Sequence, residues 1–351
     1  MAAVDLDIAG RLVGPGRPCF IIAEAGVNHD GSLDLALKLV EAARAAGADA
    51  VKFQSFRAEE VATSDAPKAQ YQLAHTAGAE SQLEMLRRLE LSPAAHRAIL
   101  ARCRELGIMF LSTGFDAQSV DLLEDLGLPA FKVPSGEITN LPLLAHIAGK
   151  HKPVILSTGM SSLAEVRRAV EILRQGGAAG IALLHCVSNY PAQPEDVNLK
   201  AMNTMARELG LPVGYSDHTL GIEVPLAAVA LGACIIEKHF TLDRSRPGPD
   251  HAASAEPEEL AALARGIRVV EAALGHGRKE PAASEEGTRQ VARRSLVAAQ
   301  HIPAGALITP EMLALKRPGT GLASERLGRV LGRRARAAIA AGTLISLEML
   351  A

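Results

Sequence analysis

The sequence has no tryptophan and few aromatic residues, which limits how the chain binds its ligands. Aromatic side chains make up 3% of the 351 residues. Proteins that stack bases or flat sugar faces on exposed rings normally carry more. The net charge of −2 at pH 7 gives no reason to expect a nucleic-acid partner either. A sugar ligand is therefore expected to be held by hydrogen bonds and charge.

The four cysteines form no C-x-x-C pair, and Cys19, Cys186 and Cys234 lie in short apolar runs. This pattern favours buried free thiols in a reducing compartment over a disulfide framework. Residues 1–16 do not resemble a signal peptide. No uncharged apolar stretch approaches the ~18 residues needed to span a bilayer. We therefore expect a soluble, cytoplasmic protein with no membrane partner.

Short apolar runs alternate with helical patterns through the first three quarters of the chain. The runs predict eight strands, at Cys19–Ala25, Ala50–Phe56, Ile108–Thr113, Ala130–Pro134, Pro153–Ser157, Ile181–Val187, Pro212–Ser216 and Cys234–Phe240. The patterns between them predict helices, among them Leu33–Ala46, Pro93–Leu106, Ser161–Gln175, Asn198–Leu209 and Glu223–Leu231. Each crossover is long enough for a helix, so the strands should be parallel.

Eight such units in the first three quarters of the chain favour an α/β fold of the (β/α)8, or TIM barrel, type. The structural alternative is a doubly wound open sheet. It is disfavoured because no G-x-G-x-x-G motif follows the first strand. Polar residues also follow many strands instead of gathering at one crevice. We therefore predict a barrel domain over residues 1–275.

The composition changes after Leu274. Residues 276–289 are polar and contain glycine, as a linker would. Residues 290–351 have short apolar pieces separated by Pro-Gly turns, and we expect a small second domain there. The part from residue 276 onward carries 12 Lys or Arg against 6 Asp or Glu. This basic charge either packs against the acidic barrel or is ordinary surface variation.

Polar side chains end all eight predicted strands, where the catalytic groups of such barrels lie. Lys52 and Lys132 stand near Ser, Thr and Gly residues, a mixture that suits a small dianion such as a phosphate ester or a carboxylate. From spacing alone, a Schiff-base lysine of a class I aldolase is an equal alternative. Either lysine could also simply pair with a nearby glutamate.

Two histidines, His218 and His239, end the seventh and eighth predicted strands. Neighbouring parallel strands run ~4.8 Å apart, so both imidazoles could reach one metal ion. Two histidines with open positions for water and substrate would suit a Lewis-acid role. Without further context, such a pair is more often hydrogen-bonded structure than a metal site.

Several motifs occur in the order that is typical of one enzyme family. They are Phe20-Ile-Ile-Ala-Glu-Ala-Gly-Val-Asn-His29, Ala48-Asp-Ala-Val-Lys-Phe-Gln54, Phe131-Lys-Val-Pro-Ser-Gly-Glu137, Ile155-Leu-Ser-Thr-Gly-Met160, Ser216-Asp-His-Thr219, Glu237-Lys-His-Phe-Thr241 and Gly248-Pro-Asp250. With these motifs the chain resembles the sialic acid synthases. The segment Lys316-Arg-Pro-Gly319 resembles their C-terminal antifreeze-like (SAF) domain, so the resemblance covers nearly the whole chain.

The resemblance implies an enzyme that joins phosphoenolpyruvate, a mannosamine-type sugar and water, and releases phosphate by C–O cleavage. It implies a domain-swapped homodimer with one divalent ion per site, Mn²⁺ or else Mg²⁺ or Co²⁺, on His218 and His239. Glu24 and Glu137 would handle protons. The substrates would meet Lys52, Gln54, Thr113, Lys132, Ser135, Gly136, Ser157, Ser188, Tyr190, Ser216, Asp250 and, from the partner subunit, Arg317.

The sequence departs from the family pattern at two positions. Ser188 stands where some bacterial members have asparagine, and Gly114 stands where proline is frequent. The acceptor is expected to be N-acetylmannosamine, which gives sialic acid; a 2,4-diacetamido-2,4,6-trideoxymannose, which gives legionaminic acid, is the alternative. A class I aldolase, or a binding protein suggested by the antifreeze-like segment, are competing hypotheses from other classes.

Overall fold

The computed structural model describes residues 5–69, 72–73, 76 and 80–351 of the chain. The chain divides into two compact units, Met1–Gly275 and His276–Ala351. Among the described residues, no helix has both the length and the apolar character needed to cross a lipid bilayer. All four cysteines are unpaired and buried, as predicted.

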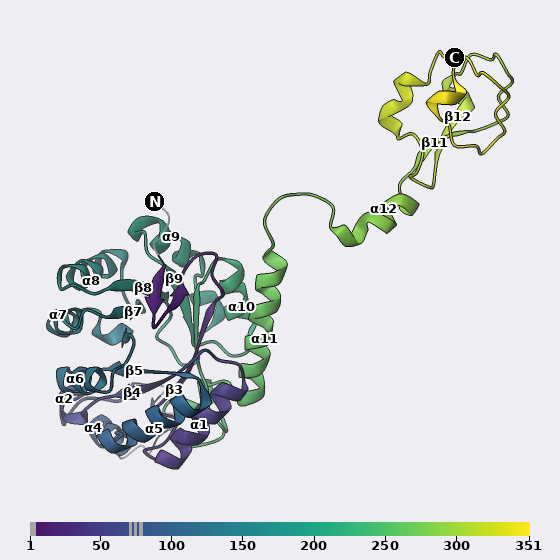
Figure 1. Ribbon diagram of the computed structural model, residues 1–351. Helices are drawn as coiled ribbons and strands as arrows, with labels where there is room; N and C mark the ends of the chain where they lie inside the picture. Colours follow the sequence, from purple (N-terminus) through teal and green to yellow (C-terminus); the bar gives the residue numbers. More distant parts are fainter. Residues whose placement is uncertain (1–4, 70–71, 74–75, 77–79) are drawn as a thin grey trace. The chain divides into compact units, whose positions relative to one another are not determined.

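The first unit is a closed barrel of eight parallel strands, which confirms the predicted TIM barrel (Figure 1). Its strands lie in the order β10-β3-β4-β5-β6-β7-β8-β9. Each lies within about two residues of its prediction. Their bounds are β3 Phe20–Gly26, β4 Ala50–Ser55, β5 Met109–Gly114, β6 Phe131–Val133, β7 Pro153–Ser157, β8 Gly180–His185, β9 Val213–Asp217 and β10 Ile235–His239.

Helices surround the strands (Figure 1). They are α1 Leu33–Ala45, α5 Pro93–Leu106, α6 Ala117–Asp125, α7 Leu141–Ala148, α8 Leu163–Gln175, α9 Lys200–Leu209, α10 Glu223–Ala230 and α11 Pro257–Leu274, with the shorter α2 Ala58–Val61 and α4 Gln82–Leu89 after β4. Local signals set their ends. For example, Ser162 and Glu165 form a capping box at α8, and Gly107, at φ 65°, ends α5.

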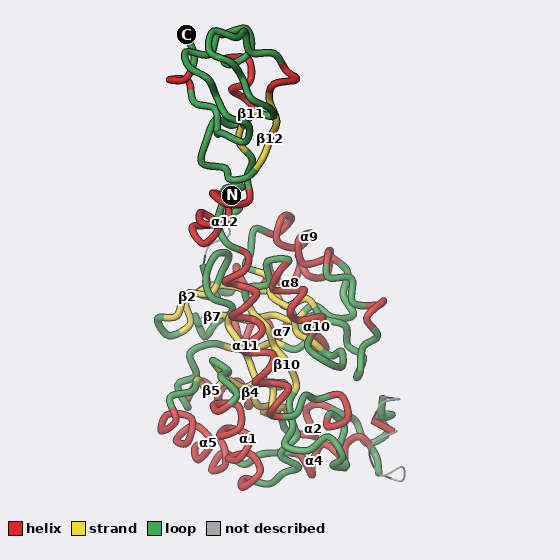
Figure 2. Tube along the Cα trace, turned by 90° about the vertical axis from the view of Figure 1, so that its right-hand side faces the viewer, coloured by secondary structure: helices red, strands yellow, loops and turns green. Residues whose placement is uncertain are grey.

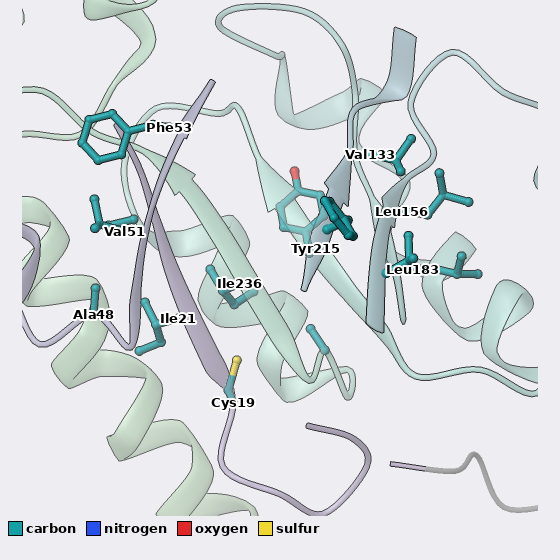
Figure 3. Packing of buried hydrophobic residues seen from close by; sticks show 14 of the residues in the cluster. Cys19, Ile21, Ala48, Val51, Phe53, Val133, Leu156, Leu183, Tyr215 and Ile236 are labelled. Atoms are coloured by element: carbon teal, nitrogen blue, oxygen red, sulfur yellow. The ribbon is translucent and has the colours of Figure 1, made fainter. Parts of the chain in front are cut away.

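Two apolar layers form the core of the barrel unit. Outward-facing strand residues pack against the helices, as Figure 3 shows for Ile21, Val51, Leu156 and Ile236. Inward-facing residues such as Phe20 form a second cluster inside the barrel. A hairpin that we did not predict, β1 Leu6–Ile8 with β2 Arg11–Val13, adds Leu6, Ile8 and Val13 to this inner cluster. The barrel interior is therefore filled at the end where the strands begin.

The second unit has its own small apolar cluster, which includes Leu296, Ile302, Ile308, Val330 and Ile345. Its strands β11 Ser295–Ala298 and β12 Leu313–Lys316 pair antiparallel, and loops make up most of the rest (Figure 2). The segment that we expected to be a linker, 276–289, includes the first part of helix α12, Glu286–Ala292.

Candidate active site

The inward-facing positions of the barrel change from apolar to polar toward the carboxyl ends of the strands. In β3 the sequence is Phe20, Ile22 and then Glu24, and in β10 it is Ile235 and then Glu237 and His239. Side chains alternate along a strand, so every second residue enters the barrel. The polar ends line a cavity of about 400 Å³.

This cavity brings together most of the residues that the sequence predicted. The predicted residues in its lining are Glu24, Lys52, Gln54, Thr113, Lys132, Ser135, Gly136, Ser157, Ser188, Tyr190, Ser216, His218, His239 and Asp250. Strand register explains the gathering. Glu24 lies opposite His239 on one side and Lys52 on the other, and Thr113 lies opposite Lys132.

Lys52 is a buried cation enclosed by two carboxylates. Its Nζ lies 2.5 Å from Glu24 Oε2 and 3.8 Å from Glu237 Oε2, and it donates to Thr113 Oγ1 at 3.0 Å. Burial opposes the charge, but Glu237 and Glu24 outweigh it and raise the pKa of Lys52. Lys52 is therefore held protonated, which makes it a poor Schiff-base nucleophile.

Lys132 shares Glu237 with Lys52. Its Nζ lies 3.5 Å from Glu237 Oε1 and donates to Ser157 Oγ at 2.8 Å. Ser216 donates to the same Glu237 oxygen at 3.0 Å. Burial lowers the pKa of Lys132. Burial alone would raise the pKa of Glu237, but Lys132 and Lys52 lower it, so this carboxylate stays ionised between them.

Serine hydroxyls line the cavity together with Lys132, and we call Lys52, Lys132 and these hydroxyls the anion cradle. Ser135 Oγ accepts the backbone N–H of Gly159 at 2.9 Å and lies 3.1 Å from Cys186 Sγ. A Cβ on Gly159 would come within 2.4 Å of Ser188 Oγ, so only glycine fits there. The departure Ser188 thus places a hydroxyl in the cradle. The hydroxyls of Ser135, Ser157 and Ser188 in the lining suit a phosphate or carboxylate.

The imidazoles of His218 and His239 face each other with ring centroids 5.4 Å apart. His218 Nδ1 donates to the Val187 carbonyl at 2.5 Å, because a carbonyl only accepts; its Nε2 therefore keeps a free lone pair. Burial lowers the pKa of both rings, which keeps them neutral. His239 Nδ1 is buried without a hydrogen-bond partner. An orphaned nitrogen and a second oriented imidazole fit a divalent metal ion.

Protein atoms would supply few of the metal's ligands. Among the residues that the structure describes, no group of three or more His, Cys, Asp and Glu side chains is placed to hold an ion. Asp250 Oδ2 lies 3.5 Å from His239 Nδ1, and the ring centroid of Tyr190 lies 4.2 Å from that of His218. The remaining positions would be open to water or substrate, as a Lewis-acid role requires.

Two carboxylic acids near the His218–His239 pair, Glu24 and Asp250, bind their protons more tightly than usual. Gln54 Nε2 donates to Glu24 Oε1 at 3.3 Å, and a Cβ on Gly26, at φ +53°, would lie 3.3 Å from Glu24 Oε1 and 3.5 Å from Asp250 Oδ2. Burial raises the pKa of Glu24 to about 7 and that of Asp250 to about 6. Both groups can therefore exchange protons near neutral pH.

The assignment of Glu137 as a catalytic residue stays a prediction. Glu137 lies in a short 3₁₀ turn, does not line the cavity, and accepts a hydrogen bond from Asn140 Nδ2 at 2.7 Å. Glu237, which our selection missed, lies between the two lysines instead. The available signal was its spacing, because Glu237 and His239 are two residues apart on one strand and must share a face.

Arg317 belongs to the second unit. Its Nε donates to the Ala292 carbonyl at 3.0 Å. The assignment of Arg317 as a substrate-binding residue stays a prediction.

The fold and the cavity define an enzyme of the (β/α)8 class, with a built anion site beside two neutral imidazoles at the carboxyl ends of the strands. The chain belongs to the NeuB family, whose model matches residues 39–279. A SAF domain model matches residues 293–351, which confirms the antifreeze-like C-terminal domain. The resemblance to the sialic acid synthases is thereby confirmed.

Similar proteins cover nearly the whole chain. N,N'-diacetyllegionaminic acid synthase of Legionella pneumophila is 50% identical over 95% of each chain. Human N-acetylneuraminate-9-phosphate synthase is 39% identical over 89% of this chain and 87% of its own. The crystal structure of N-acetylneuraminic acid synthetase from Leptospira borgpetersenii, in complex with citrate, has a TM-score of 0.74. It is 37% identical and covers 82% of this chain and 95% of its own.

Proposed function

We propose that the enzyme condenses phosphoenolpyruvate with an N-acetylmannosamine-type sugar and water, and releases a nonulosonic acid and phosphate. The observation that carries the proposal is one cavity that holds both a cationic anion cradle and a pair of neutral imidazoles. The names of the similar proteins support the same chemistry. The cradle around Lys52 and Lys132 suits the phosphate and carboxylate of phosphoenolpyruvate.

A divalent ion completes this proposal. His218 and His239 would hold one ion per site, Mn²⁺ or else Mg²⁺ or Co²⁺. When bound, the ion supplies Lewis-acid polarisation of the sugar aldehyde. The protein's own contribution is orientation. The lysines and serines fix phosphoenolpyruvate so that its C3 faces the aldehyde carbon, and such positioning is worth up to ~7–11 kcal/mol.

The bond changes require proton transfers, which the buried carboxyl groups can carry out. A C–C bond forms between C3 of phosphoenolpyruvate and the aldehyde carbon, water adds at C2, and the C–O bond to phosphate breaks. The aldehyde oxygen gains one proton. The water loses one proton as it adds at C2 and its second proton as the C2 carbonyl forms, and in the overall balance this second proton leaves with phosphate. Glu24, whose pKa lies near neutrality, suits the donor role, and the ionised Glu237 suits the acceptor role. General acid–base help of this kind contributes roughly 10²–10⁴-fold.

The charges of the cavity favour a sugar without a phosphate group. Among the described residues that line the cavity, Lys52 and Lys132 are the only lysine or arginine side chains. Phosphoenolpyruvate engages both. A second phosphate would then meet the carboxyl groups of Glu24, Glu237 and Asp250, with no further lysine or arginine in the described lining to offset them. The acceptor is N-acetylmannosamine or its 2,4-diacetamido-2,4,6-trideoxy counterpart, and the name of the Legionella protein supports the second.

The assembly is proposed to be a domain-swapped homodimer that places Arg317 of the partner subunit over each cavity. The enzyme is proposed to work in the cytoplasm, where the four unpaired thiols stay reduced. Differently tagged Arg317→Ala and His218→Ala chains test this. A swap gives mixed dimers with one intact site, hence about half the wild-type activity. If Arg317 served its own barrel, both sites of the mixed dimer would be defective and the dimer inactive.

A phosphate-release assay with phosphoenolpyruvate, Mn²⁺ and each amino sugar tests the activity itself. Oxygen-18 in the bridging position should leave with phosphate, whereas label retained in the product would contradict C–O cleavage. Borohydride with pyruvate should leave Lys132 unmodified, because only a Schiff-base aldolase traps that adduct. Absence of phosphate release with every acceptor would refute the proposal.

A further inference from the structure

One side of the cavity is apolar and forms a hydrophobic cluster of its own. Val27, Phe56, Met85 and Leu89 are buried together, and Leu86 and Phe115 pack against them. This cluster is separate from both core layers of the barrel. All six side chains line the cavity. We call these six residues the apolar wall.

The apolar wall is built on fixed parts of the fold. Val27 follows β3, Phe56 follows β4 and Phe115 follows β5, and the other three residues lie on α4. The rings of Phe56 and Phe115 meet edge to face with centroids 6.0 Å apart. A capping box at Ser81 begins α4, and Glu90, which ends it, accepts the backbone N–H of Ala58 at 2.6 Å. The wall is therefore tied to the strands that carry the polar residues.

The order of strands places the wall away from the histidines. His218 follows β9 and His239 ends β10, whereas Phe56 follows β4, two strands further around the barrel. At ~4.8 Å for each strand step, this is on the order of 10 Å along the barrel wall. Glu24, on β3, and Gln54, on β4, line the same cavity and are joined by a hydrogen bond of 3.3 Å. An extended sugar whose aldehyde meets the histidines and whose chain crosses Glu24 and Gln54 would bring its far end, C4 to C6, to the apolar wall.

Burial against the apolar wall is unfavourable for a hydroxyl group and favourable for a methyl group. The six side chains offer neither donors nor acceptors beyond the weak thioether of Met85, so a hydroxyl packed directly against them gives up hydrogen bonds to water without replacement. The amide side chains of the same lining are those of Gln54, Gln72 and Gln82. A methyl group gives up none and gains burial. N-acetylmannosamine presents hydroxyls at C4 and C6. The 2,4-diacetamido-2,4,6-trideoxy sugar presents the C6 methyl and a C4 acetamido group, whose methyl can be buried against the wall while its N–H and C=O need polar partners such as Gln72 or Gln82, which also line the cavity.

We propose that the apolar wall is a specificity subsite that selects an amino sugar with methyl groups, in place of hydroxyls, at its C4–C6 end. The inference rests on the proposed condensation and names its preferred acceptor. The wall contributes through burial of these methyl groups, while the aldehyde end and phosphoenolpyruvate use the polar side of the cavity. Discrimination should therefore appear between acceptors and not in the use of phosphoenolpyruvate.

Three acceptors that differ stepwise test this selection in the full-length enzyme with Mn²⁺. They are N-acetylmannosamine, its 6-deoxy analogue and 2,4-diacetamido-2,4,6-trideoxymannose. We expect kcat/KM to rise about tenfold to hundredfold when the C6 hydroxyl is removed, and to rise again with the C4 acetamido group. Equal kcat/KM values for all three would overturn the subsite. Phosphate release with none of them would instead refute the condensation.

A matched pair of variants on α4 places the selection on the wall. Leu86 and Leu83 are both half-buried, but only Leu86 lines the cavity. Leu86→Gln should lower the preference for the 6-deoxy sugar about tenfold and leave the KM for phosphoenolpyruvate unchanged, whereas Leu83→Gln should leave the preference intact. An unchanged preference in a folded Leu86→Gln enzyme would overturn the assignment. A change of kcat/KM that appeared only with acceptors carrying longer acyl groups on C2 would overturn it as well.

Discussion

Lys238 and Asp217 form a fully buried ion pair in the barrel wall, with Nζ 2.6 Å from Oδ2. The two residues lie in register on β10 and β9. Lys238 also donates to the Thr219 carbonyl at 2.5 Å. Their immediate neighbours in the chain, among them His218 and His239, line the cavity. The pair therefore joins β9 to β10 on the side of the strands that faces away from the cavity.

We predict that this ion pair positions the histidines for metal. In the double variant Asp217→Asn/Lys238→Met the buried charges are removed together, which is often neutral for stability. The strand ends lose their common anchor, and Mn²⁺ should bind about 10–100-fold more weakly by calorimetry, as when supporting residues of other metal sites are lost. A folded double variant with unchanged Mn²⁺ affinity would show that the pair is merely structural.

The carboxylates Glu237 and Glu137 should behave very differently. Glu237→Gln removes the charge that both lysines share, and we expect kcat to fall roughly 10²–10⁴-fold. Glu137→Gln changes a group that meets Asn140 outside the cavity, so kcat should stay within about twofold. Steady-state kinetics with both substrates decides. The reverse ranking would restore Glu137 as the catalytic carboxylate.

Loss of either buried lysine should chiefly damage use of phosphoenolpyruvate. Each removes charge-assisted contacts worth on the order of 1.5–3 kcal/mol, so Lys52→Ala and Lys132→Ala should raise the KM for phosphoenolpyruvate roughly tenfold to hundredfold. Lys150, which pairs with Asp121 and Glu124 on the surface, is the control. A selective rise in the sugar KM would mean that the anion cradle is wrongly assigned.

Removal of the metal should abolish turnover. Excess EDTA should stop phosphate release, and added Mn²⁺, Mg²⁺ or Co²⁺ should restore it. His218→Ala and His239→Ala should each eliminate Mn²⁺ binding by calorimetry and reduce kcat at least 10²-fold, with little loss of folding stability. His146→Ala, at an exposed pair with Asp121, should have no such effect. Full activity in EDTA would exclude the metal from the reaction.

Stability should depend on pH through Glu24. Burial raises its pKa from 4.5 to about 7 in the folded protein, so the contribution of Glu24 is present below pH 4.5 and is lost as the pH rises through 7. In metal-free protein, Glu24→Gln should therefore raise the Tm relative to wild type at pH 8, with a difference that shrinks toward pH 4.5.

Glu237 provides the opposite sign as a control. Its pKa is lowered in the folded protein despite burial, because of Lys132 and Lys52. Its stabilising contribution is present above its ordinary pKa and disappears in acid, so Glu237→Gln should lower the Tm at pH 8. Thermal unfolding of both variants from pH 4.5 to 8 measures the contrast. Parallel curves for the two would contradict these assignments.

The linear sequence determined the barrel and much of its polar end. Short apolar runs with long crossovers predict parallel strands, because the periodicity of buried side chains is a local property. The same alternation carries Glu24, Lys52 and His239 into the interior once the strands are known. Residues on neighbouring strand ends meet because all eight strands end at one face.

Tertiary structure alone decided which of these side chains cooperate. Sequence patterns gave Glu137 and Glu237 similar settings, yet Glu137 lies in the turn after β6 and is not part of the cavity lining, while β10 places Glu237 between two lysines. The apolar wall and the Lys238–Asp217 pair likewise arise from strand register and from the seating of α4. Such contacts join residues far apart in the chain, so they cannot be predicted from local periodicity. Their distances are set only when the barrel closes.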